Sequence, residues 1–335
     1  MPNHQGGDLP RAWIKTKPED WQVVEQYAAE FSGQGEHAYL YVEKRGLSTP
    51  PVAQWLSDRL EVPLLDVGYA GMKDKHAVTR QWFSVRLPGN HPLPLAQDLN
   101  LDRGDEQITV LASHQHHRKL RRGEHQANGF TIVLREVTPD LDCRELQARI
   151  QAGFPNYFGP QRFGRCNLAD AMTWLAQRRR RKISRRARGW HLSVLRSWVF
   201  NRLLASRVED GTWQTVLQGD LTSAVGKDEV LVATGPLWGR GREPLSGEAL
   251  QWQQRAMAED ASGMPMTLGE VCEALEYAGV DRGQRPLSVT PWDVECSQTG
   301  TTVTVSFCLP VGAYATVMLN NHFDLQDKSV ESVNE

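Results

Sequence analysis

The stretch Gly68–Leu87, GYAGMKDKHAVTRQWFSVRL, joins a glycine-rich loop and a charged turn to a run of alternating apolar residues. Gly68 and Gly71 lack side chains, which suits a tight turn or the close approach of another group to the backbone. From Thr79 to Leu87 apolar residues alternate with polar ones, a pattern that is typical of a strand with one buried face. The stretch therefore predicts a loop that leads into a half-buried strand.

More strands are predicted on both sides of this stretch, because the same apolar pattern returns in four places: Trp21–Glu25, Ala38–Glu43, Phe130–Val137 and Thr301–Leu309. Apolar residues at helical spacing predict a helix that begins near Ser48–Pro51, another over residues 143–152, and helical structure over residues 166–210. The polar residues Gln326–Glu335 are expected to fray.

The chain has 335 residues, a length that fits about two domains. After Gly153 the composition becomes helical and then acidic, and strand patterns return near the C-terminus. We therefore expect a discontinuous α+β domain of residues 1–152 and 293–335, interrupted by a largely helical insertion of residues 153–292.

Several classes of protein are excluded by what the sequence lacks. The mean hydropathy is −0.48, and no apolar run reaches the ~18 residues of a membrane-spanning helix. We see no secretory signal, P-loop, nucleophile elbow, dinucleotide fingerprint or zinc-deaminase motif. The five scattered cysteines include no C-x-x-C pair, which argues against a disulfide framework and favours a reducing, cytoplasmic location.

The net charge of −2 hides an uneven distribution along the chain. Residues 101–200 carry 19 Lys and Arg against 9 Asp and Glu, whereas residues 201–335 carry 9 against 19. Such charge runs often mark solvated faces. A segment this basic within an acidic chain favours instead a polyanionic partner, and nucleic acid is the interpretation we prefer.

The charged turn contains Asp74 between Lys73 and Lys75, with His76 next in the chain. Neighbouring cations favour the ionised form of a carboxyl group, as a nucleophile or a base requires. The same cations attract phosphates. Taken alone, however, a Lys-Asp-Lys triplet is more often an ordinary solvated turn.

Other charged or aromatic segments allow two interpretations each. The run His116–Arg122 suits phosphate contacts better than a metal site, because its cations would repel a divalent ion. Phe130 could stack on an exposed base or belong to the core. The block Arg178–Arg188 is an RNA-binding arm or a mobile loop, and Asn156–Arg165 suits either stacking on RNA or a domain junction.

Four segments in order along the chain carry a resemblance to a known family: Lys15–Trp21 (KTKPEDW), Ala70–Thr79 (AGMKDKHAVT), Pro155–Gly164 (PNYFGPQRFG) and Leu309–Thr316 (LPVGAYAT). The chain resembles TruD-type tRNA pseudouridine synthases over nearly its whole length. The resemblance implies an α+β fold: a mixed, mostly antiparallel sheet of pseudouridine-synthase type with an inserted α/β (TRUD) domain.

The resemblance also implies an activity, the conversion of a uridine in tRNA to pseudouridine without a cofactor or a metal. The target in this family is uridine 13 of glutamate tRNA. We therefore expect a cytoplasmic, monomeric isomerase whose partner is tRNA and not a membrane.

Carried over residue by residue, the resemblance makes Asp74 the catalytic aspartate and Lys15 its ionic partner. Phe130 would face the target base beside Asn128, and Trp21 would complete the active-site wall. The chain departs from the family pattern at Ala127, where the family has glycine, and at Trp21, where it has phenylalanine. It also has Asn320-Asn321 in place of an Arg-Glu pair.

The expected RNA contacts are basic residues near Asp74, in residues 118–122 and in the predicted insertion: Lys73, Lys75, His76, Arg118, Lys119, Arg121, Arg122, Arg162, Arg178, Arg179, Arg180, Arg181, Lys182, Arg185, Arg186 and Arg188. Two other functions are alternatives. One is a tRNA-binding protein or RNA chaperone without catalysis, and the other is a metal-dependent nuclease built on His114, His116 and His117.

Overall fold

The computed structural model describes residues 9–28, 30–89, 93–138, 141–164, 167–177, 183–258 and 266–331. The chain divides into two compact units. We call residues 9–151, 291–312 and 323–331 the sheet unit, and residues 152–290 with 313–322 the helical unit. The segment Ala313–His322 belongs to the helical unit, whereas the sequence boundaries assign it to the other domain. Which unit is the catalytic domain and which the insertion stays a prediction.

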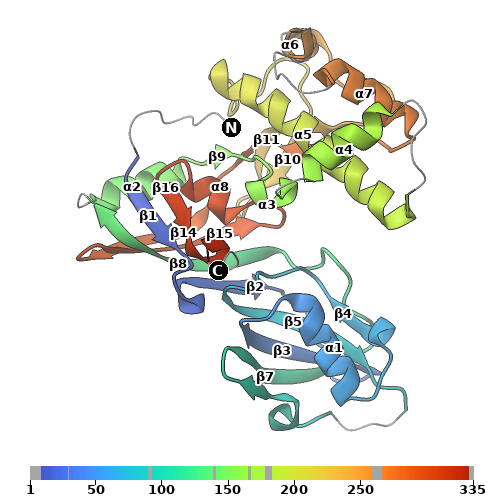
Figure 1. Ribbon diagram of the computed structural model, residues 1–335, viewed down its shortest axis with the longest axis vertical. Helices are drawn as coiled ribbons and strands as arrows, with labels where there is room; N and C mark the ends of the chain where they lie inside the picture. The colour runs from blue at the N-terminus through green and yellow to red at the C-terminus, as the bar shows by residue number, and fades with distance from the viewer. Residues whose placement is uncertain are drawn as a thin grey trace. The chain divides into compact units, whose positions relative to one another are not determined.

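The described residues of the sheet unit form one sheet of 11 strands, in which the order β14-β15-β8-β2-β5-β3-β7-β6 is extended by three strands off this path (Figure 1). Most neighbours are antiparallel, but β2 and β5 run parallel. The α+β class and the mixed, mostly antiparallel sheet are thus confirmed. The strands are β1 (Arg11–Ile14), β2 (Trp21–Gln26), β3 (His37–Arg45), β4 (Val67–Tyr69), β5 (Val78–Arg86), β6 (Leu101–Arg103), β7 (Glu106–His116), β8 (Ala127–Thr138), β14 (Trp292–Thr299), β15 (Thr302–Pro310) and β16 (Asp324–Asp327).

A helix covers one end of this sheet. α1 (Thr49–Arg59) has prolines in its first turn, where a missing backbone N–H costs nothing. Its residues Val52, Ala53 and Leu56 are buried against Leu40 and Val42 of β3 and against β5, and Figure 1 shows the helix lying across these strands. The predicted helix near Ser48–Pro51 is therefore confirmed, and its apolar face forms one core of the unit.

The C-terminal segment differs from the sequence expectation. Instead of fraying from Gln326, the chain forms β16, which pairs in parallel with β1 so that Ile14 lies opposite Asp327. A short helix, α9 (Lys328–Glu331), follows. The polar composition that predicted fraying is explained by position, because a strand at the edge of a sheet needs few apolar side chains.

The remaining elements of the sheet unit are a helix, α2 (Cys143–Gln151), and three short 3-10 helices, η1 (Pro18–Asp20), η2 (Leu64–Asp66) and η3 (Ala96–Leu99). The predicted helix over residues 143–152 is confirmed by α2. The strands predicted at Trp21–Glu25, Ala38–Glu43 and Phe130–Val137 are confirmed as parts of β2, β3 and β8.

The helical unit has a core of its own. Apolar side chains of α4, α5 and α7 pack together with Trp238 and Trp252, and Leu195 and Val199 of the long helix α5 are fully buried. The elements are α3 (Pro160–Phe163), α4 (Asn167–Ala176), α5 (Arg185–Glu209), α6 (Gly247–Ala258), α7 (Leu268–Tyr277) and α8 (Ala315–Leu319), a pair of strands β9 (Phe154–Pro155) and β13 (Ser288–Val289), and a sheet of β10 (Thr222–Val225), β11 (Val230–Leu237) and β12 (Gly283–Pro286).

Candidate active site

The loop that carries Asp74 lies between β4 and β5, and buried polar groups hold its backbone. The Nζ of Lys44 donates hydrogen bonds to the carbonyl oxygens of Asp74 (2.7 Å) and Leu47 (2.5 Å). Lys73 donates its N–H to Oγ1 of Thr49 at 2.9 Å, and Gln81 donates to the carbonyl of Gly71 at 3.1 Å. The loop is therefore fixed from below, while the side chain of Asp74 stays 40% exposed.

Lys15 is the ionic partner of the Asp74 carboxylate, with 3.3 Å between Nζ and Oδ2. Lys15 is buried, and its Nζ also lies 4.7 Å from the ring centroid of Trp21 and 3.9 Å from the carboxylate of Asp327. The backbone φ of Lys15 is 55°, a left-handed conformation that costs a non-glycine residue about 1–2 kcal/mol. The surrounding contacts hold the ammonium against Asp74 despite that cost.

A second charged network lies directly behind the loop. The Nζ of Lys73 contacts the Glu25 carboxylate at 3.1 Å and Oδ1 of Asn128 at 2.7 Å. Burial raises the pKa of Glu25, and the Lys73 ammonium opposes that rise. Burial, together with the charge of Lys73, lowers the pKa of His125 to about 4, so this imidazole is neutral at pH 7.

Phe130 lies on the same face of the sheet as these groups. In the antiparallel pairing of β2 with β8, Glu25 is opposite Asn128 and Val23 is opposite Phe130. Paired residues point to one side of a sheet, and so do residues two apart on a strand. The half-buried Phe130 ring also stacks on Phe307, at 5.2 Å between ring centroids. One face of the sheet thus carries the Phe130 ring together with Asn128 and Glu25, the two groups that hold Lys73 of the Asp74 loop.

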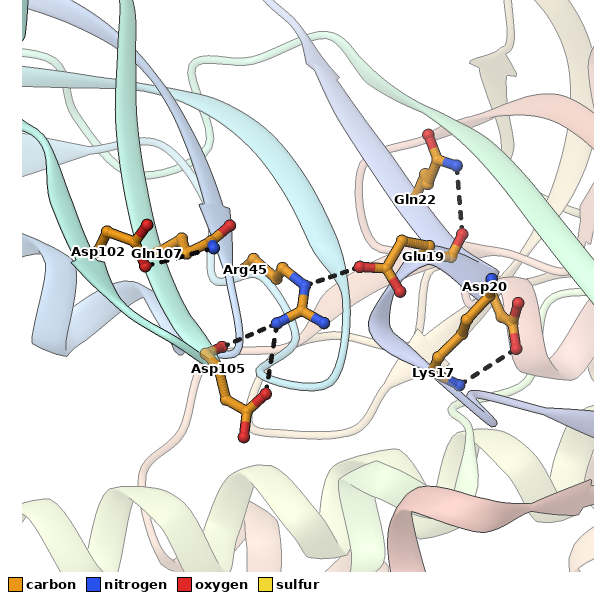
Figure 2. A network of polar contacts seen from close by, with 8 residues as sticks. All are labelled: Lys17, Glu19, Asp20, Gln22, Arg45, Asp102, Asp105 and Gln107. Carbon is orange, nitrogen blue, oxygen red and sulfur yellow. Dashed lines mark hydrogen bonds and ion pairs between the residues drawn. The ribbon is translucent and has the colours of Figure 1, made fainter.

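The segment Lys15–Trp21 is fixed by ion pairs of its acidic residues. Figure 2 shows Arg45 between Glu19 and Asp105, with 2.7 Å from its Nε to Oε1 of Glu19. The fully buried Asp20 accepts two hydrogen bonds from Arg135, at 2.7 and 2.8 Å. These carboxylates position the backbone around Lys15.

The basic residues 118–122 pack against the chain that leads to Asp74. A side chain at Gly68 would lie 2.4 Å from the carbonyl of Leu120, so only glycine allows this approach. Leu120 donates its N–H to Oγ of Ser84, and Gly123 donates its own to the carbonyl of Ala70, both at 2.9 Å. The exposed cations of this segment are therefore held on β4 and on the start of the Asp74 loop.

Two of the residues proposed from the sequence are buried. Lys73 was expected to contact RNA, but it is buried and its ammonium is bound by Glu25 and Asn128. Trp21 was expected in the wall that faces a base, but only 2% of it is exposed and it lies beneath Lys15. Both side chains support the site from below, and their expected contacts with RNA and with the base stay predictions.

The other proposed RNA contacts are distributed over both units. In the sheet unit, Lys75, Arg118, Arg121 and Arg122 are exposed, whereas His76 and Lys119 are half-buried. In the helical unit, Arg185, Arg186 and Arg188 at the start of α5 are exposed, and Arg162 is half-buried over the ring of Trp190, at 4.9 Å. Arg178, Arg179, Arg180, Arg181 and Lys182 lie outside the described residues.

The histidines suggested for a nuclease site belong to an aromatic cluster. His114 stacks on Phe31, at 4.5 Å between ring centroids, and His116 packs edge-on against Tyr39. Among the residues that the structure describes, no group of three or more His, Cys, Asp and Glu side chains could hold a metal ion. The nuclease hypothesis therefore has no support in the described part of the chain.

Four residues of the site escaped the sequence reasoning. Two of them lie on strands of the sheet, Lys44 on β3 and Glu25 on β2. The other two are His125, just before β8, and Asp327 on β16. A charged residue within an apolar strand, as Lys44 and Glu25 are, was the available signal, because a buried charge needs a partner.

In the described ranges, no helix combines the length and apolarity that a membrane crossing requires.

Comparisons with known proteins agree with the resemblance. A family model described as tRNA pseudouridine synthase D (TruD) matches residues 11–171. A protein named tRNA pseudouridine synthase D from Methylococcus capsulatus is 40% identical, covering 97% of this chain and 95% of its own. A protein of that name from Pseudomonas putida is 39% identical over 97% of this chain and 94% of its own.

Among solved structures, a crystal structure assigned to tRNA pseudouridine synthase D from Methanosarcina mazei is similar, with a TM-score of 0.67 over 96% of both chains. Its sequence identity of 17% supports the fold alone. The curated relatives support more, because their identity is high over nearly the whole chain. The chain therefore belongs to the TruD family of tRNA pseudouridine synthases, isomerases that act on tRNA.

Proposed function

We propose that this enzyme converts uridine 13 of glutamate tRNA to pseudouridine, with Asp74 as its catalytic carboxylate. The observation that carries the proposal is the Lys15–Asp74 ion pair, at 3.3 Å, on a loop whose Lys73 is bound by Glu25 and Asn128 of the sheet face that also carries Phe130. The choice of nucleotide and of tRNA rests on the resemblance of the four motifs to the family.

The proposed reaction is balanced without a cofactor. The bond between C1′ of the ribose and N1 of uracil breaks, and a bond between C1′ and C5 forms. C5 loses a proton and N1 gains one, so there is no net oxidation or reduction. An ionised carboxylate is suited to this chemistry, either as a nucleophile or as a base. The Lys15 ammonium, with its Nζ 3.3 Å from Oδ2, orients the Asp74 carboxylate.

The target uridine has to leave its stack to reach such a carboxylate, at a cost of a few kcal/mol. Phe130 is suited to receive the base, because an aromatic ring stacks on a uracil that is turned out of its RNA fold. Lys75 is exposed next to Asp74 and is suited to a phosphate near the target. In this proposal Phe130 and Lys75 bind the RNA and Asp74 carries out the chemistry. Mutations can therefore separate binding from catalysis.

The decisive experiment compares Asp74→Asn with the native enzyme on a transcript of glutamate tRNA. Pseudouridine is mapped by chemical derivatisation and primer extension, and tRNA binding is measured in parallel. We expect binding within about threefold of native and no detectable pseudouridine, because asparagine has no negative charge. Asp98→Asn, at an exposed carboxylate of the same unit, is the matched control and should leave the activity intact.

The same assay separates the alternatives. Modification by Asp74→Asn at the native rate would disprove a catalytic Asp74. Binding without modification by the native enzyme would favour the tRNA-binding protein. A transcript with cytidine at position 13 should remain unmodified, and pseudouridine elsewhere in it would contradict the proposed target.

A further inference from the structure

A cavity of about 420 Å³ lies in the sheet unit, outside the contacts of Asp74. It is bounded by α1, η2, β4 and the basic residues 119–122. We propose that this cavity binds one unpaired nucleotide of the RNA substrate, in addition to the target uridine. The inference rests on the proposed function to the extent that the RNA is the tRNA that the enzyme modifies.

The first argument is the chemistry of the lining. Leu64 and Leu65 on η2 are 49% and 83% exposed, although large apolar side chains usually avoid water. On the other side, Lys119, Arg121 and Arg122 bring three cations to the same cavity. An apolar wall next to clustered cations matches a nucleotide, whose base is flat and weakly polar and whose phosphate is an anion.

The second argument is the position of Arg122 and Tyr69. The Arg122 guanidinium lies 5.1 Å from the centroid of the Tyr69 ring and donates a hydrogen bond to its hydroxyl at 3.0 Å. Arg122 is itself exposed, so its outer face is open to a stacked base. RNA-binding proteins stack bases on aromatic rings and on guanidinium planes of this kind. The pair is therefore a stacking platform prepared before RNA arrives.

The third argument is that the cavity is built on an ordered frame. Gly68 admits the carbonyl of Leu120, and Lys119 donates from Nζ to the carbonyl of Leu65, which joins the basic segment to η2. η2 in turn is held by a hydrogen bond of 2.8 Å from the N–H of Asp66 to the carbonyl of Pro63. Fixed groups lose little entropy when a ligand binds, which favours a binding role.

The cavity is close enough to the target to be occupied by the same RNA. Tyr69 and Asp74 are five residues apart in the chain, so their Cα atoms are separated by at most about 18 Å. A nucleotide held there is thus a near neighbour of the target in the folded RNA. Such a contact would position the target uridine in register with Asp74.

The test uses Leu65→Glu in the full-length enzyme, because Leu65 is 83% exposed and its replacement leaves the core intact. The new carboxylate repels a phosphate and removes an apolar contact. We expect the Kd for the tRNA transcript, measured by filter binding at fixed salt, to rise about tenfold. Leu95→Glu, at a residue 63% exposed in the same unit but outside the cavity, is the matched control and should bind like the native enzyme.

Ultraviolet crosslinking then identifies the occupant. The native enzyme should crosslink the tRNA through the peptide that contains Tyr69, and Leu65→Glu should lose that crosslink. Equal Kd values for the two glutamate variants, or no crosslink at this peptide, would overturn the proposal. A crosslink to free UMP or AMP but not to tRNA would also overturn it. Because binding is read without turnover, these results are independent of whether Asp74 is catalytic.

Discussion

At the scale of single residues, the site depends on an unfavourable backbone conformation at Lys15. Its left-handed φ of 55° is rare outside glycine. The Trp21 ring below it and the carboxylates of Asp74 and Asp327 beside it offset the cost of that conformation. A charged group that lies over an aromatic ring and among carboxylates is a geometry that only lysine or arginine provides.

Replacing Lys15 by Met therefore tests the orientation of Asp74. Methionine keeps the packing on Trp21 and removes the charge, so we expect the fold to persist and kcat to fall roughly 100-fold, since small errors in placement cost that much. Single-turnover kinetics on the tRNA transcript measure the effect. Lys15→Arg should recover part of the rate.

The matched control for this change is Lys17→Met, because Lys17 is exposed two residues away. Its rate should stay within about twofold of native. A native kcat for Lys15→Met would show that Asp74 needs no partner.

At the scale of elements, the Asp74 loop is held by strands rather than by its own residues. Lys44 on β3 is fully buried, yet it donates to two carbonyl oxygens of separate loops, those of Leu47 and Asp74. Burial lowers the pKa of Lys44 to about 8, and the Asp74 carboxylate partly opposes this shift. A charged group buried in a sheet is expensive, which is consistent with its use to position the loop.

Lys44→Met should lower kcat about tenfold with little change in the Kd for tRNA, since the loop loses its anchor but no RNA contact. Stability against pH provides the second readout. The folded pKa of about 8 is below the unfolded value near 10.5. Between these two pKa values the unfolded state binds a proton at Lys44 that the folded state does not bind. The stability of the native enzyme relative to Lys44→Met should therefore rise between pH 8 and 10 and fall again as the pH is lowered.

Urea unfolding of both proteins across that pH range measures this difference. The expected change is on the order of 3 kcal/mol over the full interval between the two pKa values. If the free energies of unfolding of the two proteins changed in parallel with pH, burial would not lower the pKa of Lys44 in the folded state.

At the scale of the whole molecule, the net charge of −2 conceals two basic surfaces, one in each unit. Lys119, Arg121 and Arg122 belong to the sheet unit, and Arg185–Arg188 begins α5 of the helical unit. Both are exposed in part and neither contributes to a core. A polyanion such as tRNA is the partner that two such surfaces favour.

The triple change Arg185→Gln, Arg186→Gln and Arg188→Gln tests the second surface. Each lost phosphate contact should reduce the slope of log Kd against log salt by about 0.7–0.9, so the total reduction is at most about 3. A control with Lys227, Arg242 and Arg255 changed to Gln removes as many exposed cations of the same unit and should keep the native slope. Equal slopes for the two triple variants would assign the arginines no role in binding.

The sequence by itself determined the local elements and the family. Alternating apolar residues formed β2, β3, β5, β8 and β15, and prolines after Ser48 began α1, because these signals act over a few residues. The motifs around Asp74 likewise stand in unbroken runs of sequence. The charge of residues 101–200 indicated a polyanionic partner without any reference to the fold.

Only the tertiary structure decided which charges face one another. Lys15 reaches Asp74 across 59 residues of chain, and Asp327 reaches Lys15 through the parallel pairing of β16 with β1. It also turned Lys73 inward to Glu25, although its neighbour Lys75 is exposed. The physical reason is that register between distant strands fixes the direction of each side chain, and no local pattern encodes that register.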